Sequence, residues 1–67
     1  MKISARNKLQ GTIKEVKVGN VMAIVKVQVG ENLLESVITR ESVEELGLKA
    51  GDKVTAMIKA TSVMIIK

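Results

Sequence analysis

The chain has 67 residues and a formal net charge of +4, and hydrophobic residues fill 46% of its positions. This length supports one small domain, and the absence of cysteine and histidine excludes disulfide bridges and the usual zinc sites. The basic balance favours anionic partners. We expect a cytoplasmic protein without membrane contact, because no apolar run is long enough to cross a bilayer and no N-terminal signal stretch is visible.

The N-terminal region is typical of a long β-strand, from about residue 8 to residue 18. Leu9, Gly11 and Ile13 share one face by the two-residue period of a strand. The apolar phase then slips, since the next inward candidate is Val16. Such a slip predicts a bulge or bend, as a curled sheet requires.

A second strand is expected at about residues 21–29, after a turn at Gly19-Asn20 whose residues tolerate positive φ. Alternate residues of this strand, mostly valines, give one continuous apolar face. Met22 and Ile24 make the other face apolar in its first half only, which predicts a subunit contact there. The strand ends at a second turn, Gly30-Glu31-Asn32.

A third strand, about residues 33–38, leads into the one expected helix. Thr39 is the candidate N-cap, and acidic residues follow it, where negative charge suits the positive end of the helix dipole. Val43 and Leu46, three positions apart, are expected to face inward. Gly47 suits a left-handed residue just after the helix, which therefore has about two turns.

Two further strands complete the predicted fold. The fourth, about residues 53–60, follows a turn at Gly51-Asp52, and the last covers about residues 63–66. Three strands, a short helix and two strands match an all-β, five-stranded OB-type barrel with its helix between strands three and four. Residues 1–67 are thus expected to form a single OB-type domain.

The apolar content also predicts self-association. A short chain buries a low fraction of its surface, and this one has neither disulfides nor soft-metal ligands to stabilise it. Oligomerisation is the remaining stabiliser. The alternative is a compact monomer with scattered surface apolar residues, which are common.

No catalytic arrangement is visible in the sequence, which therefore predicts a protein that is not an enzyme. There is no cysteine, histidine or tyrosine, and no phosphate-binding or dinucleotide glycine motif. The adjacent Glu44 and Glu45 are interpreted as a solvated helix face rather than an acid–base pair.

Two short segments are suited to an anion. Ser4 and Arg6 form an N-terminal pair, and Lys59 and Thr61 form a C-terminal pair. Residues two apart in an extended chain point the same way, so each pair combines a cation with a hydroxyl donor. Either pair alone is expected by chance as a solvated strand end. Together, at opposite ends of the chain, they predict one binding site assembled between subunits.

An OB-type barrel that binds nucleic acid is the alternative function. Such barrels usually stack bases on aromatic side chains. This chain has no aromatic residue, which argues against binding of single strands. A purely structural interaction domain is the third interpretation.

The sequence resembles the molbindins, small cytoplasmic molybdate-binding proteins built from a single Mop module. The resemblance covers nearly the whole chain and is most specific at its two ends. It rests on Ser4-Ala5-Arg6-Asn7-Lys8-Leu9, Gly11, Gly19-Asn20-Val21-Met22-Ala23, Ile38-Thr39, Ser42-Val43, Leu46-Gly47-Leu48, Gly51-Asp52, Val54-Thr55-Ala56, Ile58-Lys59-Ala60-Thr61 and Val63.

The resemblance implies a homohexamer, a trimer of dimers, that stores or buffers molybdate and also accepts tungstate. The N-terminal pair of one subunit would meet the C-terminal pair of a neighbour around the anion. A second anion site near the three-fold axis is implied at the backbone of Gly19, Asn20 and Val21, with Ser42. Molybdenum would enter as the oxyanion, with no side chain bound to the metal and no other cofactor. Neither nucleic acid nor a membrane is expected as a partner.

Overall fold

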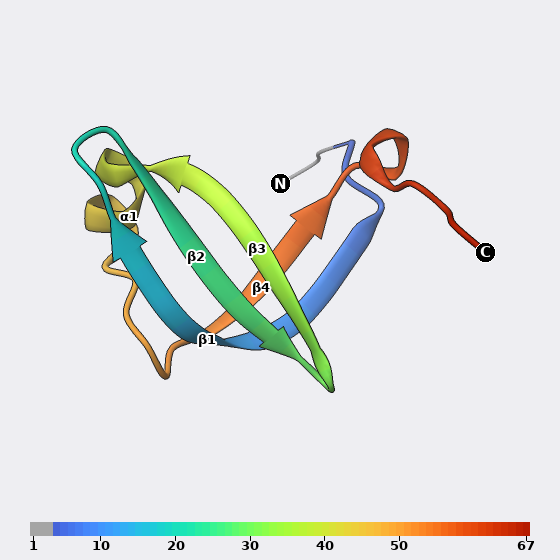
Figure 1. Cartoon of the computed structure of the whole chain (residues 1–67), viewed down its shortest axis with the longest axis horizontal. Helices are drawn as coiled ribbons and strands as arrows, with labels where there is room; N and C mark the ends of the chain where they lie inside the picture. Colours follow the sequence, from blue (N-terminus) through green and yellow to red (C-terminus); the bar gives the residue numbers. More distant parts are fainter. Residues whose placement is uncertain (1–3) are drawn as a thin grey trace.

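The computed structural model describes residues 4–67, which form one antiparallel sheet of four strands with one short helix. The strand order is β3-β2-β1-β4. Figure 1 shows the sheet folded into a V, with β4 and the first half of β1 in one arm and the remaining strands in the other. The elements are β1 (Asn7–Val18), β2 (Met22–Val29), β3 (Asn32–Thr39), α1 (Arg40–Leu46), β4 (Lys53–Ile58) and the 3-10 turn η1 (Ala60–Ser62).

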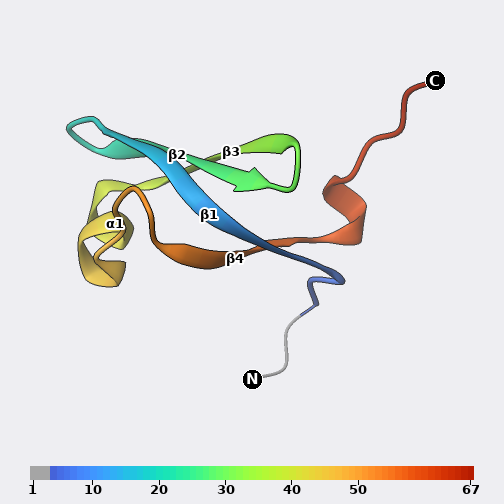
Figure 2. The same ribbon diagram turned by 90° about the horizontal axis from the view of Figure 1, so that it is seen from below.

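Strand β1 joins the two arms because its two halves have different partners. Its first half pairs with β4 and its second half with β2. The register with β2 shifts between Ile13 and Glu15, so Lys14 is an extra residue in the ladder. This bulge confirms the bend expected from the slipped apolar phase. Figure 2, seen from below, shows β1 crossing obliquely between β4 and the β2–β3 hairpin.

The core lies on the inner face of the V. Its buried side chains come from β1, β2 and the helix, and the partly buried Val54 of β4 packs against them, so burial of apolar surface holds the arms to one another. They are Ile13, Ala23, Val25, Val27 and Val43.

Helix α1 begins and ends as expected. The Ser42 N–H donates to Thr39 Oγ1 at 3.0 Å, and Gly47 has φ of 62° with its N–H bonded to the Glu44 carbonyl. The expected burial of Leu46 is wrong, since that side chain is 69% exposed. The helix has only seven residues and buries Val43 alone, and Leu46 lies at the rim of the open V.

The turn at Gly19-Asn20 forms as expected, but Gly19 is not required there for a positive φ. Positive φ is found at Gly30, Gly47 and Gly51 among the described residues, and not at Gly19. Gly19 is needed for space instead. A Cβ there would lie 2.9 Å from the Met22 carbonyl oxygen, which accepts the Gly19 N–H at 2.8 Å.

The fifth strand of the predicted barrel is not formed within the chain. Strand β4 ends at Ile58 rather than at residue 60, and η1 then turns the chain away from the sheet (Figure 1). Residues 63–67, named here the C-terminal tail, have no strand structure, and Ile65 and Ile66 are 87% and 95% exposed. A strand needs a neighbour for its hydrogen bonds, and η1 directs the tail away from the free edges of its own sheet.

Without a fifth strand, the V stays open as an apolar cleft of about 470 Å³. The cleft is lined from both arms, by Ile13, Val25 and Ile38 on one side and by Val54 and Ala56 on the other. Among residues 4–67, no helix is long and apolar enough to cross a membrane.

Candidate functional site

The two ends of the described chain meet at one end of the sheet, where β1 begins and β4 stops. Asn7 is the register partner of Ile58, and its side-chain Nδ2 donates to the Ile58 carbonyl at 3.2 Å. When this antiparallel register is continued by one residue, Arg6 stands beside Lys59. The views of Figures 1 and 2 agree that the start of β1 lies next to the end of β4.

The register cannot be continued to Ser4 and Thr61, because Thr61 lies in η1, and in Figure 2 η1 leaves the sheet on the side opposite to the chain that precedes β1. Strand pairing within one chain therefore brings together the cations of the two pairs and not their hydroxyls. Strand periodicity alone did not predict this, because it says which residues share a face and not which strands are neighbours. Sequence reasoning also missed Asn7, whose amide ties the two ends together. Its place directly after Arg6 was the available signal.

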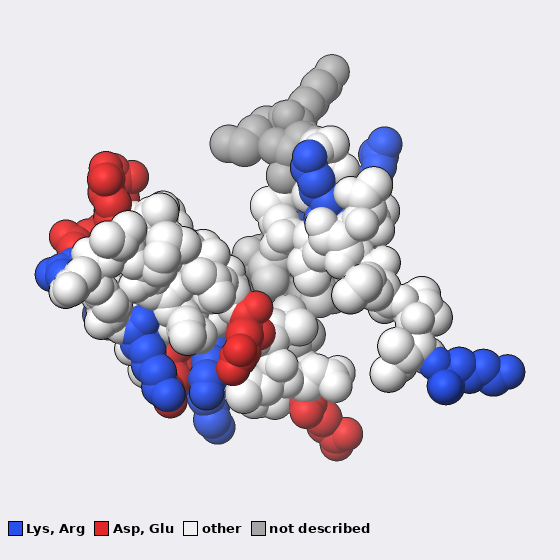
Figure 3. All heavy atoms as spheres, turned by 45° about the horizontal axis from the view of Figure 1, so that its top comes forward, with Lys and Arg blue, Asp and Glu red and all other residues white. Residues whose placement is uncertain are grey.

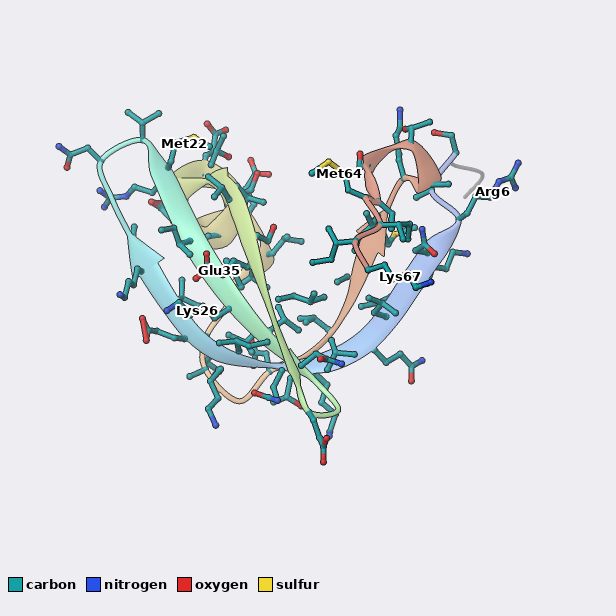
Figure 4. The ribbon with its side chains drawn as sticks, turned by 45° about the vertical axis from the view of Figure 1, so that its right-hand side comes forward. Arg6, Met22, Lys26, Glu35, Met64 and Lys67 are labelled. Atoms are coloured by element: carbon teal, nitrogen blue, oxygen red, sulfur yellow. The ribbon has the colours of Figure 1, made fainter. Side chains whose placement is uncertain are left out.

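The charge at this end of the sheet is uncompensated. The ion pairs among residues 4–67 are Lys17–Glu15, Lys26–Glu35 and Arg40–Glu44, and none includes Arg6 or Lys59. Figure 3 shows acidic side chains gathered mostly over the other arm and the helix. In Figure 4, Arg6 points outward from the start of β1 rather than into the cleft. Two neighbouring cations without a carboxylate partner favour a dianion between them.

A single chain offers only part of an anion site. Ser4, Arg6, Lys59 and Thr61 are all exposed. A bound tetrahedral oxyanion that leaves water needs hydrogen bonds to most of its oxygens. Within one chain only Arg6 and Lys59 are brought side by side, so an anion held there is open to solvent or to another molecule.

The second predicted site is not assembled in the single chain. Gly19, Asn20 and Val21 form the turn between β1 and β2, but the Gly19 N–H already donates to Met22. The Val21 carbonyl accepts from the Arg40 N–H at 2.8 Å, which brings this turn against the start of α1.

Ser42 serves the helix rather than that turn. Its Oγ accepts from the Thr39 hydroxyl at 2.8 Å, and its N–H is held by the same residue. The pocket between the turn and the helix is lined by Arg40 as well as by Glu41 and Glu44, and Arg40 is paired with Glu44 at 2.8 Å. Within one chain this pocket therefore offers an anion two carboxylates and a cation that is already engaged.

The described residues contain no cluster of acidic side chains suited to a metal ion. They form an all-β module with two unpaired cations at one end of the sheet, an arrangement that suits a small anion. The chain belongs to the TOBE domain family, whose model matches residues 3–65. The resemblance to the Mop-type proteins is thereby confirmed.

Named relatives share both sequence and fold. The chain is 48% identical over 67 residues to molybdenum-pterin-binding protein 1 of Clostridium pasteurianum, covering 98% of each chain. A molybdate-binding protein from Sporomusa ovata has a TM-score of 0.95 with 48% identity, and each chain is fully covered. The cytoplasmic molybdate-binding protein ModG, with molybdate bound, has a TM-score of 0.83 and 43% identity over 90% of this chain and 43% of its own.

Proposed function

We propose that the protein binds molybdate as an oxyanion, stores or buffers it in the cytoplasm, and catalyses no reaction. The observation that supports this proposal is the register of β1 with β4, which ends at Asn7 and Ile58, the residues next to Arg6 and Lys59. Neither cation has a carboxylate partner among residues 4–67. Relatives named for binding molybdate or molybdenum-pterin support it.

The donors suit a tetrahedral dianion. The two cations match a charge of −2, and the hydroxyls of Ser4 and Thr61 add neutral donors that spread the charge over the oxygens. Tungstate is nearly the same size as molybdate and competes for the site. Sulfate has the same shape and charge but is smaller, so selection against it rests on the size of the closed site. No further cofactor and no side-chain ligand to the metal are needed.

We further propose that the closed site forms between subunits, because two apolar surfaces of the chain lack a partner. The first is the cleft together with the C-terminal tail, whose apolar residues are exposed. The cleft lacks one strand between β3 and β4, and the tail is a strand-forming segment without a sheet. The tail of one copy placed in the cleft of another completes a five-stranded barrel and buries both surfaces.

The second surface is an outer patch around the β1–β2 turn. Ile24 and Val37 are register partners on the outer face of the sheet, and Met22 lies one step along the same face. All three are exposed, as the sequence suggested for a subunit contact, and Val18 and Val21 extend the patch to the turn. Copies that meet here bring several β1–β2 turns together. We propose that the second anion site, at Gly19, Asn20, Val21 and Ser42, is completed there.

Two different interfaces on one chain favour a closed assembly larger than a dimer. One interface exchanges tails between two copies, and the other joins copies around the outer patch. A homohexamer built as a trimer of dimers uses both surfaces. Nucleic acid is not expected as a partner, because the chain has no aromatic residue on which bases could stack.

Calorimetric titration tests the site directly. Arg6→Ala and Lys59→Ala are each expected to weaken molybdate binding by about 2–5 kcal/mol, since each removes one of two charged partners. Ser4→Ala and Thr61→Ala remove neutral donors and should lose about 1–3 kcal/mol. Lys49→Ala is the matched control, because it removes an exposed lysine from a loop outside both pairs.

Tungstate should follow molybdate through the series, and sulfate should bind poorly to every variant. The oligomeric mass is measured for each variant by native mass spectrometry. If Arg6→Ala and Lys59→Ala both keep wild-type affinity as intact oligomers, the anion binds elsewhere and the proposal is wrong.

A further inference from the structure

The anion donors lie at the joint between the sheet and the C-terminal tail. Lys59 immediately precedes η1 and Thr61 lies within it, while the tail begins at Val63. Two hydrogen bonds fix this turn, from the Ser62 N–H to the Lys59 carbonyl and from the Val63 N–H to the Ala60 carbonyl. The direction in which the tail leaves the sheet is therefore set by the segment that carries the C-terminal pair.

The other half of the site is fastened to the same joint. The Asn7 side chain binds the carbonyl of Ile58, the last residue of β4, so Arg6 is held next to the turn. The tail is only residues 63–67, so a neighbouring copy that receives it lies within about 18 Å of this joint at full extension of the tail. Its approach removes water from two cations that have no carboxylate partner among residues 4–67. Burying unpaired charge is costly, and a bound dianion offsets that cost.

We propose that oxyanion binding and seating of the C-terminal tail on a neighbouring copy are thermodynamically coupled, with the anion as the counterion that allows the joint to be buried. This inference rests on the proposed function and adds regulation of its site. Linkage then requires reciprocity: the factor by which the anion strengthens assembly equals the factor by which assembly strengthens anion binding. Such couplings typically lie between about 5-fold and 150-fold.

The first test changes the tail and leaves every donor in place. The double variant Ile65→Asn with Ile66→Asn, in the full chain, removes both isoleucines of the tail, which are exposed. Its affinity for molybdate is expected to fall about tenfold or more, although neither residue belongs to the anion site. Leu33→Asn is the matched control, since it converts an exposed apolar residue at the far β2–β3 hairpin and should keep wild-type affinity.

The second test reads the coupling from the other side. Sedimentation velocity across a dilution series measures assembly of the wild type with molybdate, with sulfate and without added anion. Molybdate should shift dissociation to concentrations at least about tenfold lower, and sulfate should shift it much less. In Arg6→Gln, which removes one cation and keeps a polar side chain, molybdate should lose most of this effect.

The outcomes separate the two proposals. If the wild type binds no molybdate, the proposed function fails and the coupling fails with it. If the wild type and Leu33→Asn bind molybdate and the folded tail variant binds equally well, the coupling is wrong while the binding site stands. If the tail variant does not fold, as judged by circular dichroism, the Arg6→Gln series decides. The coupling is contradicted if molybdate strengthens assembly of Arg6→Gln as much as it strengthens assembly of the wild type.

Discussion

Gly11 allows β1 to lie close against β2, and its replacement by alanine tests this account of the fold. A Cβ at Gly11 would lie 2.5 Å from the Gln28 carbonyl oxygen, 2.8 Å from Val27 Cγ1 and 2.9 Å from Val29 Cγ2. Ordinary contact begins near 3.4 Å, so the carbonyl would have to move by 3.4 − 2.5, or about 0.9 Å. This carbonyl belongs to the backbone of β2 and cannot rotate away as a flexible side chain does.

Overpacking of this kind costs about 1–3 kcal/mol. A small domain is typically stable by about 0.05–0.15 kcal/mol per residue, which for 67 residues is about 3–10 kcal/mol. Gly11→Ala should therefore remove a large fraction of the stability. Arg6 directly precedes β1, so a shift of β1 at position 11 also displaces Arg6. The variant should therefore weaken molybdate binding as well.

The measurement is urea unfolding followed by circular dichroism, at one protein concentration for all variants. Gly30→Asn is the control, because nothing lies within 4 Å of a Cβ there and asparagine tolerates its positive φ better than most residues. Its loss should be clearly the smaller of the two. An alanine at position 11 that leaves the urea midpoint unchanged would refute the close approach of β1 to β2.

Three further predictions follow from the fold. Thr39→Ala removes the oxygen that accepts the Ser42 N–H and should cost about 1 kcal/mol in urea unfolding, whereas Thr39→Ser should lose much less. Lys26→Glu places a third carboxylate between Glu15 and Glu35, its register partners on β1 and β3, and should destabilise by up to about 1 kcal/mol at low salt, with the loss shrinking as salt is added. Binding to single-stranded oligonucleotides should be weak, with about one unit of logarithmic salt slope per neutralised phosphate, and tight binding at about 150 mM salt in a fluorescence titration would favour the nucleic-acid alternative.

The strands and the helix could be predicted well from local patterns. Period two in β1 and β2 identified the inner face, and the slipped phase after Ile13 identified the bulge. Thr39 and Gly47 marked the ends of the helix through their own chemistry. These signals succeed because they depend on neighbours within a few residues. Leu46 was misplaced because a helical spacing does not say how far the sheet extends beneath a short helix.

The residues suited to an anion could also be identified from the sequence, because the guanidinium, the ammonium group and the two hydroxyls are given by residue type alone. What the sequence could not give was their meeting place. Ser4 and Arg6 lie more than 50 positions from Lys59 and Thr61. The approach of Arg6 to Lys59 depends on the pairing of β1 with β4.

The fate of the last segment was likewise decided by tertiary structure. Residues 63–66 have the composition of a strand, and by sequence alone they are the fifth strand of a barrel. In the structure, η1 directs them away from both free edges of their own sheet. The sequence therefore determined which segments prefer to be strands and which side chains can hold an anion. Only the tertiary structure decided which edges meet, because strand pairing joins residues far apart in the chain and leaves no mark in local periodicity.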